Sequence, residues 1–526
     1  MADRTFDAVV IGAGHNGLAA AIHLAKRGWS VGVFEAKGVA GGAVKTRELT
    51  LPGFRHDVAA MNLSMFAGSP FLRENGDALT RHGLAFVPAE HCFASVFPDD
   101  TYFGVSKSLD TTMARLAALS ATDAAAWQRL LEKFASDAPH LFGLLGSAMP
   151  SLAAAKVVWA AWRQKGTTWT LDMLRFLMTS TRTWLDANFE NPKVKATLAA
   201  WGMHLDFAPD ISGGALFPYL ESMANQAFGM VIGKGGADTM ITAMTSYFKE
   251  LGGEIHLNAA VQKISRTAGT ADAIILADGQ RVPARRAVIA NVTPNILFNH
   301  LLPGGSGNAS VDSRFRTFRP GPGTMMVHLA LDGPIAWKAG AELSNFAYVH
   351  IAPSLDYMTR AYTQAMDGFL PEAPVVVVGQ PTALDPTRAP EGKHIAWMQV
   401  RVLPKHVKGD ATGAIKSGDW PEIKDAYADR VISMLETYAP GTRKKIIGCS
   451  VFSPDDLEAE NPCLVGGDNL SGSHHLDQNF LFRPVAGYSR YKMPVAKLYM
   501  CGAATWPGAG TGAGSGYLLG KMLAGK

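Results

Sequence analysis

The chain has 526 residues, 48% of them hydrophobic and 18% charged, which is too long for one ordinary core. A net charge of +4 is small for this length, and no basic run occurs, so a nucleic-acid partner is not expected. Four cysteines stand far apart without a CxxC pair, which argues against a disulfide framework and against a metal site. A first strand that starts within six residues leaves no room for a signal peptide, so a soluble, cytoplasmic, multi-domain enzyme is expected.

The first predicted unit is a strand, a tight turn, a small-residue helix and a second strand, FDAVVIGAGHNGLAAAIHLAKRGWSVGVFEA. Gly12, Gly14 and Gly17 fill G-x-G-x-x-G, in which the glycines permit the turn, backbone approach to a pyrophosphate, and helix–strand packing. Glu35 ends the second strand, where a carboxylate binds ribose hydroxyls and repels a 2′-phosphate. The unit therefore predicts binding of a dinucleotide other than NADP.

A polar loop with paired glycines follows, EAKGVAGGAVKTRELTLPGFRHD. Gly41 and Gly42 allow the chain to pass close beside an extended dinucleotide, although such a pair is also typical of a flexible turn. His56 comes next to Asp57 at the end of this stretch. It is a candidate for a catalytic or substrate contact, and the alternative is a structural histidine with its hydrogen bonds satisfied.

The middle of the chain is predicted to be helical. Residues 111–145 carry apolar side chains at i, i+3/i+4 spacing, and residues 141–163 are long enough to span a bilayer. Pro150 and Lys156 interrupt that stretch, so spanning is disfavoured. After Pro150, Lys156, Trp159 and Arg163 share one helical face, which fits a helix lying in a membrane interface or a lid over a substrate cavity. Further along, His204, Asp206 and Glu221 are weak candidates for pocket residues.

The second half alternates strands and turns. Residues 271–290 read as a β-meander with a hairpin turn at Asp278-Gly279, and GTMMVHLALDG and PVVVVGQPTALDP supply β-branched runs for an antiparallel sheet. His474 and His475 are predicted to lie in a solvated loop, because adjacent side chains diverge and no third ligand is near. The chain closes with a strand and a glycine-rich helix start, LYMCGAATWPGAGTGAGSGYLLGKML.

Several of these blocks together resemble the amine-oxidase and phytoene-desaturase group of FAD proteins, in particular the branch that contains pyridine nucleotide-disulfide oxidoreductase domain-containing protein 2. They are Glu35, Gly41-Gly42, PGFRHD, the Gly-Gly turn near residue 235 and the closing block, and the resemblance runs from about residue 6 to 523. It implies FAD as cofactor and no metal. The residues that it places at the cofactor are Gly12, Gly14, His15, Asn16, Gly17, Glu35, Ala36, Gly41, Gly42, Ala43, Val261, Gly502, Ala503, Thr511, Gly512 and Ala513. Val261 is implied to contact the adenine, and the N–H groups of Thr511 to Ala513 the flavin pyrimidine edge.

The same resemblance implies an α/β fold in two parts. Segments 1–75, 225–300 and 465–526 would form a discontinuous Rossmann-type FAD domain with a parallel sheet and a β-meander. Segments 76–224 and 301–464 would form a substrate domain with an antiparallel sheet and a helical lid. Substrate would bind between the domains, a common place for pockets.

The implied activity is dehydrogenation of a hydrophobic, lipid-like or polyene substrate by hydride transfer to the flavin, with oxygen or a quinone as electron acceptor and membrane contact through 141–165. An amine oxidase, with Trp506 and Tyr517 as an aromatic pair, a redox-neutral double-bond isomerase and a flavoprotein kept for scaffolding remain alternatives. Two positions depart from the carotenoid pattern: Ala43 replaces an arginine, and Trp506 replaces a histidine before proline. His56 and Trp506 are the catalytic candidates, and the oligomeric state is open.

Overall fold

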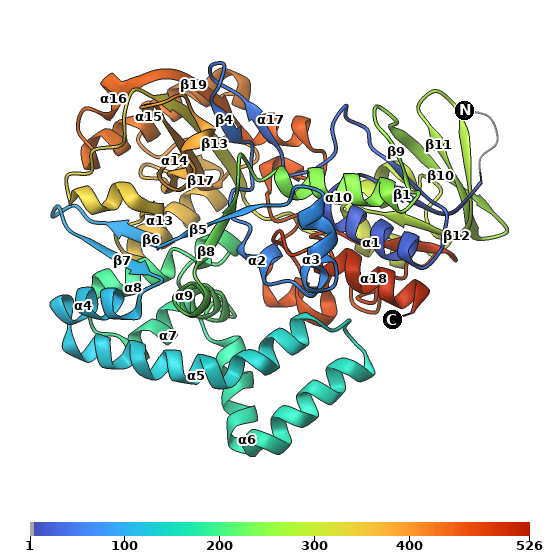
Figure 1. Ribbon diagram of the computed structural model, residues 1–526, viewed down its shortest axis with the longest axis horizontal. Coiled ribbons are helices and arrows are strands. Elements are labelled where there is room, and N and C mark those ends of the chain that lie inside the picture. Colours follow the sequence, from blue (N-terminus) through green and yellow to red (C-terminus); the bar gives the residue numbers. More distant parts are fainter. Residues whose placement is uncertain (1–4, 526) are drawn as a thin grey trace.

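The computed structural model describes residues 5–525 and contains two large sheets with helices packed around them (Figure 1). The first sheet has the strand order β10-β11-β12-β1-β2-β9, and β20 also pairs with β12. Its strands are β1 (Phe6–Ile11), β2 (Val31–Phe34), β9 (Glu254–His256), β10 (Val261–Thr267), β11 (Thr270–Leu276), β12 (Arg281–Ala290) and β20 (Leu498–Met500).

Strand β12 pairs antiparallel along its first part and parallel along its last part. Its first residues pair antiparallel with β11, which continues into β10 and forms the predicted β-meander. Its last residues pair parallel with β1 on one side and β20 on the other, and β2 and β9 extend this parallel part. Strands β1 and β2 are almost wholly buried, because helices pack on one face of the sheet and side chains of β10 and β11 join the apolar cluster on the other. The parallel sheet with a meander is therefore confirmed.

Helices α1 (His15–Lys26), α10 (Thr239–Glu250) and α18 (Gly514–Ala524) cover one face of this sheet, with α3 (Pro70–Arg81) beside them (Figure 1). Leu18, Met244 and Leu519 show how their apolar sides meet in one buried cluster. The first and last helices of the chain thus pack on each other and on the strands between them.

The second sheet has the order β19-β13-β17-β16-β14-β6-β7. Its strands are β6 (His91–Val96), β7 (Tyr102–Ser106), β13 (Gly323–Leu331), β14 (Phe346–Ile351), β16 (Val375–Gly379), β17 (His394–Leu403) and β19 (Ile446–Phe452). All pairs are antiparallel except β14 with β6. The two β-branched runs predicted to form a sheet are β13 and β16. Helix α15 (Trp420–Tyr438) packs on one face and a helical layer lies toward the other.

The helical layer contains α4 (Leu109–Leu119), α5 (Ala121–Leu145), α6 (Leu152–Met178), α7 (Thr181–Asn188), α8 (Pro192–Ala199) and α9 (Leu216–Phe228). Serine N-caps begin four of these six helices, and each side chain accepts a hydrogen bond from the first turn. Helix α6 is broken at Gly166, where φ is +84°, and α5 and α6 form an arm that projects from the molecule (Figure 1). The helix predicted after Pro150 is confirmed.

The remaining elements are short or lie at the periphery. Three two-stranded sheets pair β3 (Thr46–Glu48) with β4 (Arg55–Asp57), β5 (Phe86–Ala89) with β8 (Met230–Gly233), and β15 (Phe369–Leu370) with β18 (Gly409–Asp410). The other helices are α2 (Ser64–Ala67), α11 (Pro294–Ile296), α12 (Ala309–Arg316), α13 (Leu355–Met366), α14 (Pro381–Leu384), α16 (Thr442–Lys445) and α17 (Pro454–Glu460). Within residues 5–525, every helix falls short of the length or apolar character that a bilayer crossing requires.

Candidate functional site

The first glycine turn joins β1 to α1 and leaves the helix start open. Gly12 has φ +91°, and a Cβ at Gly17 would lie 2.5 Å from the Gly12 carbonyl oxygen, so both positions require glycine. Gly14 is the N-cap of α1, with no side-chain cap and no acidic residue in the first turn. The N–H groups and positive dipole end of α1 are therefore available to a pyrophosphate.

Glu35 follows β2 and faces the same turn. One carboxylate oxygen accepts a hydrogen bond from the Ala13 N–H at 2.8 Å, and the other accepts from the Lys37 N–H at 2.9 Å. These bonds fix the carboxylate beside the turn, where it can receive ribose hydroxyls.

A cleft of about 310 Å³ extends from this turn. Twelve of the residues predicted to hold the cofactor line it: Gly12, Gly14, His15, Asn16, Glu35, Ala36, Gly42, Ala43, Val261, Gly502, Ala503 and Thr511. Four do not, namely Gly17, Gly41, Gly512 and Ala513. A Cβ at Gly41 would lie 2.3 Å from the Val44 carbonyl oxygen, so this glycine serves the loop, and Ala513 is the left-handed N-cap of α18. The glycine cradle, the open helix start and the fixed carboxylate fit FAD.

Asn291, just after β12, was not predicted and also lines the cleft. Its side-chain nitrogen donates to the Gly12 carbonyl at 3.3 Å, and a Cβ at Gly14 would lie 3.1 Å from that nitrogen. A Cβ at Gly502 would lie 3.0 Å from its side-chain oxygen. One amide therefore contacts both glycine-rich turns. The sequence signal was VIAN at the end of a predicted strand.

The closing glycine run also has a packing role that the sequence did not reveal. A Cβ at Gly516 would lie 1.7 Å from the Asn16 carbonyl oxygen, and one at Gly520 would lie 2.9 Å from the His23 Cβ. The Gly516 N–H donates to the Asn16 side chain at 3.3 Å. These two glycines bring α18 against α1 rather than lining the cleft.

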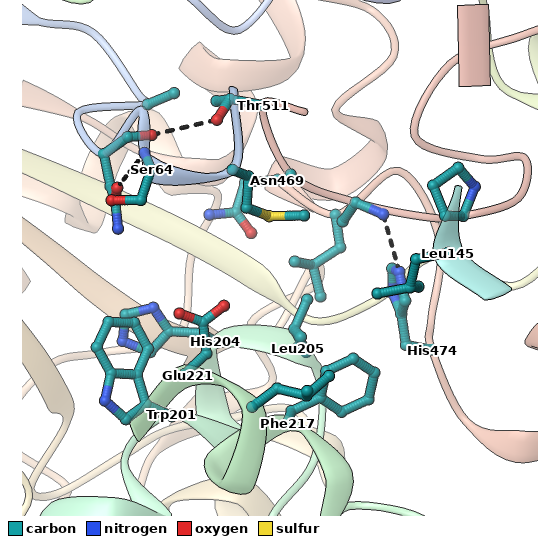
Figure 2. Close-up of a pocket in the computed structure, with 18 of the residues that line it drawn as sticks. Ser64, Leu145, Trp201, His204, Leu205, Phe217, Glu221, Asn469, His474 and Thr511 are labelled. Atoms are coloured by element: carbon teal, nitrogen blue, oxygen red, sulfur yellow. Dashed lines mark hydrogen bonds between the residues drawn. The ribbon is translucent and has the colours of Figure 1, made fainter. Parts of the chain in front are cut away.

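A second cavity, of about 450 Å³, adjoins the cleft. The two share Ala43, Ala60, Asn469, Gly510 and Thr511, which we call the junction residues. Away from the junction, the α5–α6 arm contributes a wall of apolar side chains: Leu141, Leu144, Leu145, Met149 and Leu177. Figure 2 shows Leu145 and Thr511 on different sides of this space. The second cavity therefore meets the cleft at the junction residues and the α5–α6 arm on its far side.

Polar groups gather at another part of the cavity wall. Glu221 of α9 directs its carboxylate into the space beside His204 and Trp201 (Figure 2). Burial raises the pKa of Glu221 to about 7 and lowers the pKa of His204 well below its usual range, so the imidazole is neutral. Two of the weak sequence candidates, His204 and Glu221, are thus lining residues. Asp206 is not, and it receives a hydrogen bond from Tyr362 at 2.9 Å.

Trp506 lines the second cavity and connects the closing block of the chain to the loop between α5 and α6. The indole is 2% exposed, its Nε1–H donates to the Ser147 carbonyl at 2.8 Å, and its ring packs on Phe480. Tyr517, its expected aromatic partner in an amine-oxidase site, does not line the cavity and donates to Glu74. The pair that an amine oxidase would need is therefore not formed by these two residues.

His56 lies in β4, outside both cavities. Its Nε2 bonds to the Thr50 hydroxyl at 2.8 Å, and its ring packs edge-on against His328. Burial is the main cause that lowers its pKa to about 4, and repulsion from the charge of Arg388 is the second. These contacts fit the structural alternative. Asp57 is buried in an ion pair with Arg388.

The prediction for His474 is wrong. This side chain is buried, lines the second cavity, and its Nε2 accepts the Ala509 N–H at 3.1 Å (Figure 2). His475 turns the other way and contacts the Asp206 carbonyl oxygen at 2.8 Å. The sequence predicted a solvated loop because it did not show that the closing turn, at Ala509, packs on His474.

Comparisons with known proteins agree with this geometry. The family model described as flavin containing amine oxidoreductase matches residues 17–447. Pyridine nucleotide-disulfide oxidoreductase domain-containing protein 2 of Rattus norvegicus is 28% identical, over 96% of this chain and 91% of the relative. Phytoene desaturase (neurosporene-forming) of Cereibacter sphaeroides is 26% identical, over 97% and 92%.

Solved structures show the same fold. An oxidoreductase from Methanosarcina mazei superimposes with a TM-score of 0.63 at 18% identity, covering 97% of this chain and 98% of that one. A putrescine oxidase superimposes with a TM-score of 0.60 at 16% identity, covering 99% and 98%. With a family match over most of its length, the chain belongs to the flavin-containing amine oxidoreductases and is an FAD-dependent oxidoreductase.

Proposed function

We propose that the protein dehydrogenates a hydrophobic substrate, introducing a double bond. The observation that carries this proposal is the apolar cavity, which meets the cofactor cleft at the junction residues and is closed by leucines of the α5–α6 arm. Relatives named phytoene desaturase and limonene dehydrogenase support the reaction class. Bound FAD would supply the hydride acceptor for such a reaction.

The residues of the chain would supply the remaining requirements. The lid leucines would exclude water, and the junction residue Thr511, three positions before α18, would offer its N–H group to the flavin pyrimidine edge. As a hydride leaves one carbon, the neighbouring carbon must lose a proton to form the double bond. Glu221 is the one carboxyl among the described lining residues, and with a pKa of about 7 it can accept that proton. Oxygen or a quinone would then take the two electrons from the cofactor.

The alternative of an amine substrate is less well supported by the cavity. Its stacked aromatic pair, Tyr348 and Trp397, has ring centroids 5.7 Å apart at 26°, so the rings contact each other and leave no slot for a substrate between them.

Anaerobic reduction of the FAD-loaded enzyme tests the proposal. We expect a lipophilic alkene or polyene donor to bleach the flavin absorbance and to yield a product two hydrogen atoms lighter by mass spectrometry. Glu221→Gln should slow bleaching without loss of bound flavin. Bleaching by alkylamines alone would assign the enzyme to amine oxidation. A product of unchanged mass, formed only after prior reduction of the flavin, would assign it to isomerisation.

We also propose that the two sheets with their helices are the cofactor and substrate domains. The boundaries at 75 and 225 fall inside α3 and α9, so we place these two at the helix ends, near residues 82 and 229. The boundary near 300 falls inside the helical turn Leu297–Leu301, so we place it near residue 302, and the boundary near 465 stays as predicted.

We further propose that helix α6 rests on an anionic membrane surface. Trp159 is 56% exposed and Trp162 45%, and Leu171 and Leu174 are exposed beyond the break in the helix. The helix has four basic residues and one acidic residue, and Arg163 lies 5.0 Å from the centre of the Trp159 ring. Exposed tryptophan with flanking cations fits a bilayer interface. The same arm lines the substrate cavity, so a lipophilic substrate could pass from the membrane into it.

Vesicle co-sedimentation tests this contact. We expect binding to phosphatidylglycerol-containing vesicles, weaker binding to phosphatidylcholine alone, and loss of binding in a Trp159→Ser/Trp162→Ser variant. A Phe369→Ser variant, changed at an exposed aromatic on β15, should bind as the wild type does. Equal sedimentation of the tryptophan variant would contradict the proposal. A dimer that the tryptophan variant abolishes would instead show that a second copy covers α6.

A further inference from the structure

Three arginine side chains are buried in the described chain, and two of them have compensated charges. Arg388 is fully buried and pairs with the carboxylates of Asp57 and Asp385. Arg483 is also fully buried, and its nitrogens donate to a ring of backbone carbonyls. Arg401, 8% exposed on β17, lines the substrate cavity and has neither kind of compensation.

The partners of Arg401 are few and neutral. Nη2 donates to Nδ1 of His204 at 3.0 Å, and Nη1 donates to the Asn469 side chain at 3.2 Å and to the His204 carbonyl at 3.4 Å. Because His204 Nδ1 accepts from a cation, its Nε2 carries the proton and donates to His350 Nε2 at 3.1 Å. Burial, and then the charge of Arg401, lowers the pKa of both imidazoles, so both rings are neutral and neither offsets the charge of Arg401.

No carboxylate takes the place of these neutral partners. Among the described residues, no acidic side chain lies within 4.0 Å of the Arg401 nitrogens. Asp468 attracts Arg401 from further away, but its oxygens already accept the N–H groups of Gly321, Leu470 and Gly472. Glu221 lies on the same cavity wall, and within the described chain it forms no ion pair with Arg401.

The cavity wall around Arg401 also holds hydrogen-bond donors without acceptors. Arg401 Nε, Trp201 Nε1 and Trp397 Nε1 are all buried and unpaired. All three side chains line the cavity, and Arg401 is the only lysine or arginine among the described lining residues. A buried cation without an opposite charge costs several kcal/mol, and each unpaired buried donor adds to that cost. A ligand that brings a negative, acceptor-only group would remove both costs.

We propose that Arg401 anchors a carboxylate of the substrate, so that the substrate class is an amphipathic acid with an apolar tail. This inference rests on the proposed dehydrogenation of a hydrophobic substrate and adds the head group to it. A carboxylate has only acceptor oxygens and forms charge-assisted hydrogen bonds with a guanidinium, which are about twice as strong as neutral ones. It matches the donor-rich wall, while the lid leucines match the tail.

The anchor also sets the direction in which the substrate lies. Asn469, which accepts from Arg401, is a junction residue, whereas Leu141, Leu144 and Leu145 lie on the lid side. The carboxylate end is therefore held on the cofactor side of the cavity, and the tail extends toward the α5–α6 arm.

Ligand binding to the oxidised, FAD-loaded enzyme tests the anchor without requiring turnover. Decanoate, decanol and decylamine share one tail and differ only in the head group. We expect decanoate to perturb the flavin absorbance and to bind about 10- to 100-fold more tightly than decanol, with decylamine weakest. Arg401→Met should abolish the preference for decanoate over decanol, and Arg401→Lys should keep part of it.

Arg360→Met serves as the matched control, because Arg360 is 67% exposed on α13 and pairs with a surface glutamate. Its head-group preference should equal that of the wild type, and bound flavin should be retained in every variant. Equal binding of decanoate and decanol, an unchanged preference in Arg401→Met, or no binding of any of the three ligands would overturn the anchor. Failure of the dehydrogenation proposal would appear separately, as an absence of flavin bleaching by donors that bind.

Discussion

Replacement of Gly516 by alanine should loosen the cofactor site through helix packing alone. A Cβ at this position would lie 1.7 Å from the Asn16 carbonyl oxygen, and contacts below 3.0 Å essentially do not occur. Helices α1 and α18 must then separate by about 1.3 Å, because the obstructing atom is backbone and cannot rotate away. The start of α1 carries the open N–H groups of the first turn, and α18 begins three residues after the junction residue Thr511.

The size of the effect follows from two opposing contributions. Alanine gains about 0.5–1 kcal/mol of helix stability over glycine, whereas overpacking a tight contact costs about 1–3 kcal/mol or more. We expect a net loss of stability at the helix pair. If FAD requires the original spacing, a cost of 1–3 kcal/mol weakens FAD binding about 5- to 150-fold.

The assay is FAD retention during gel filtration, with the thermal midpoint of the holoenzyme as a second measurement. Gly76→Ala is a matched control within α3, because the Cβ there would meet only Leu72 side-chain atoms at 4.0 Å. This control should retain flavin fully and gain slightly in stability. Wild-type flavin retention and midpoint in Gly516→Ala would refute the packing role.

Three further changes have expected outcomes of different kinds. Asp57→Asn breaks the fully buried pair with Arg388 and should lower the unfolding free energy by about 3–5 kcal/mol in urea titrations, with an unchanged value contradicting the pairing. Because the folded-state pKa of Glu221 is raised, from an ordinary 4.5 to about 7, wild-type stability should fall as pH rises from about 4.5 to 7. The unfolding free energy of Glu221→Gln minus that of wild type should therefore be higher at pH 8 than at pH 5, by up to about 3 kcal/mol. The same difference at both pH values would contradict the raised pKa. Trp506→Phe leaves the Ser147 carbonyl without its donor, at a cost of about 1–3 kcal/mol, and hydrogen exchange of amides near residue 147 should accelerate, whereas unchanged protection would contradict the tie.

The sequence allowed prediction where neighbours along the chain determine the structure. The turn at Gly12, the carboxylate at Glu35 and the helix after Pro150 depend on patterns within about 30 consecutive residues, and all lie where the sequence indicated. The burial of His474 and the isolation of Arg401 could not be predicted, because they depend on contacts between residues that lie 35 and 197 positions apart in the sequence. An arginine within a strand such as β17 looks the same in sequence whether a carboxylate meets it or not.

The position of β12 has a consequence for the order of events during synthesis. This strand is flanked by β1, from the beginning of the chain, and by β20, from near its end, and Asn291 after it contacts both glycine-rich turns. A ribosome must therefore deliver nearly all of the sequence before the cleft wall is complete, and long-range closure of this kind is slow. We therefore expect flavin capture to follow synthesis of the closing strand, and a nascent chain arrested before residue 498 should lack bound flavin even when its earlier helices have formed.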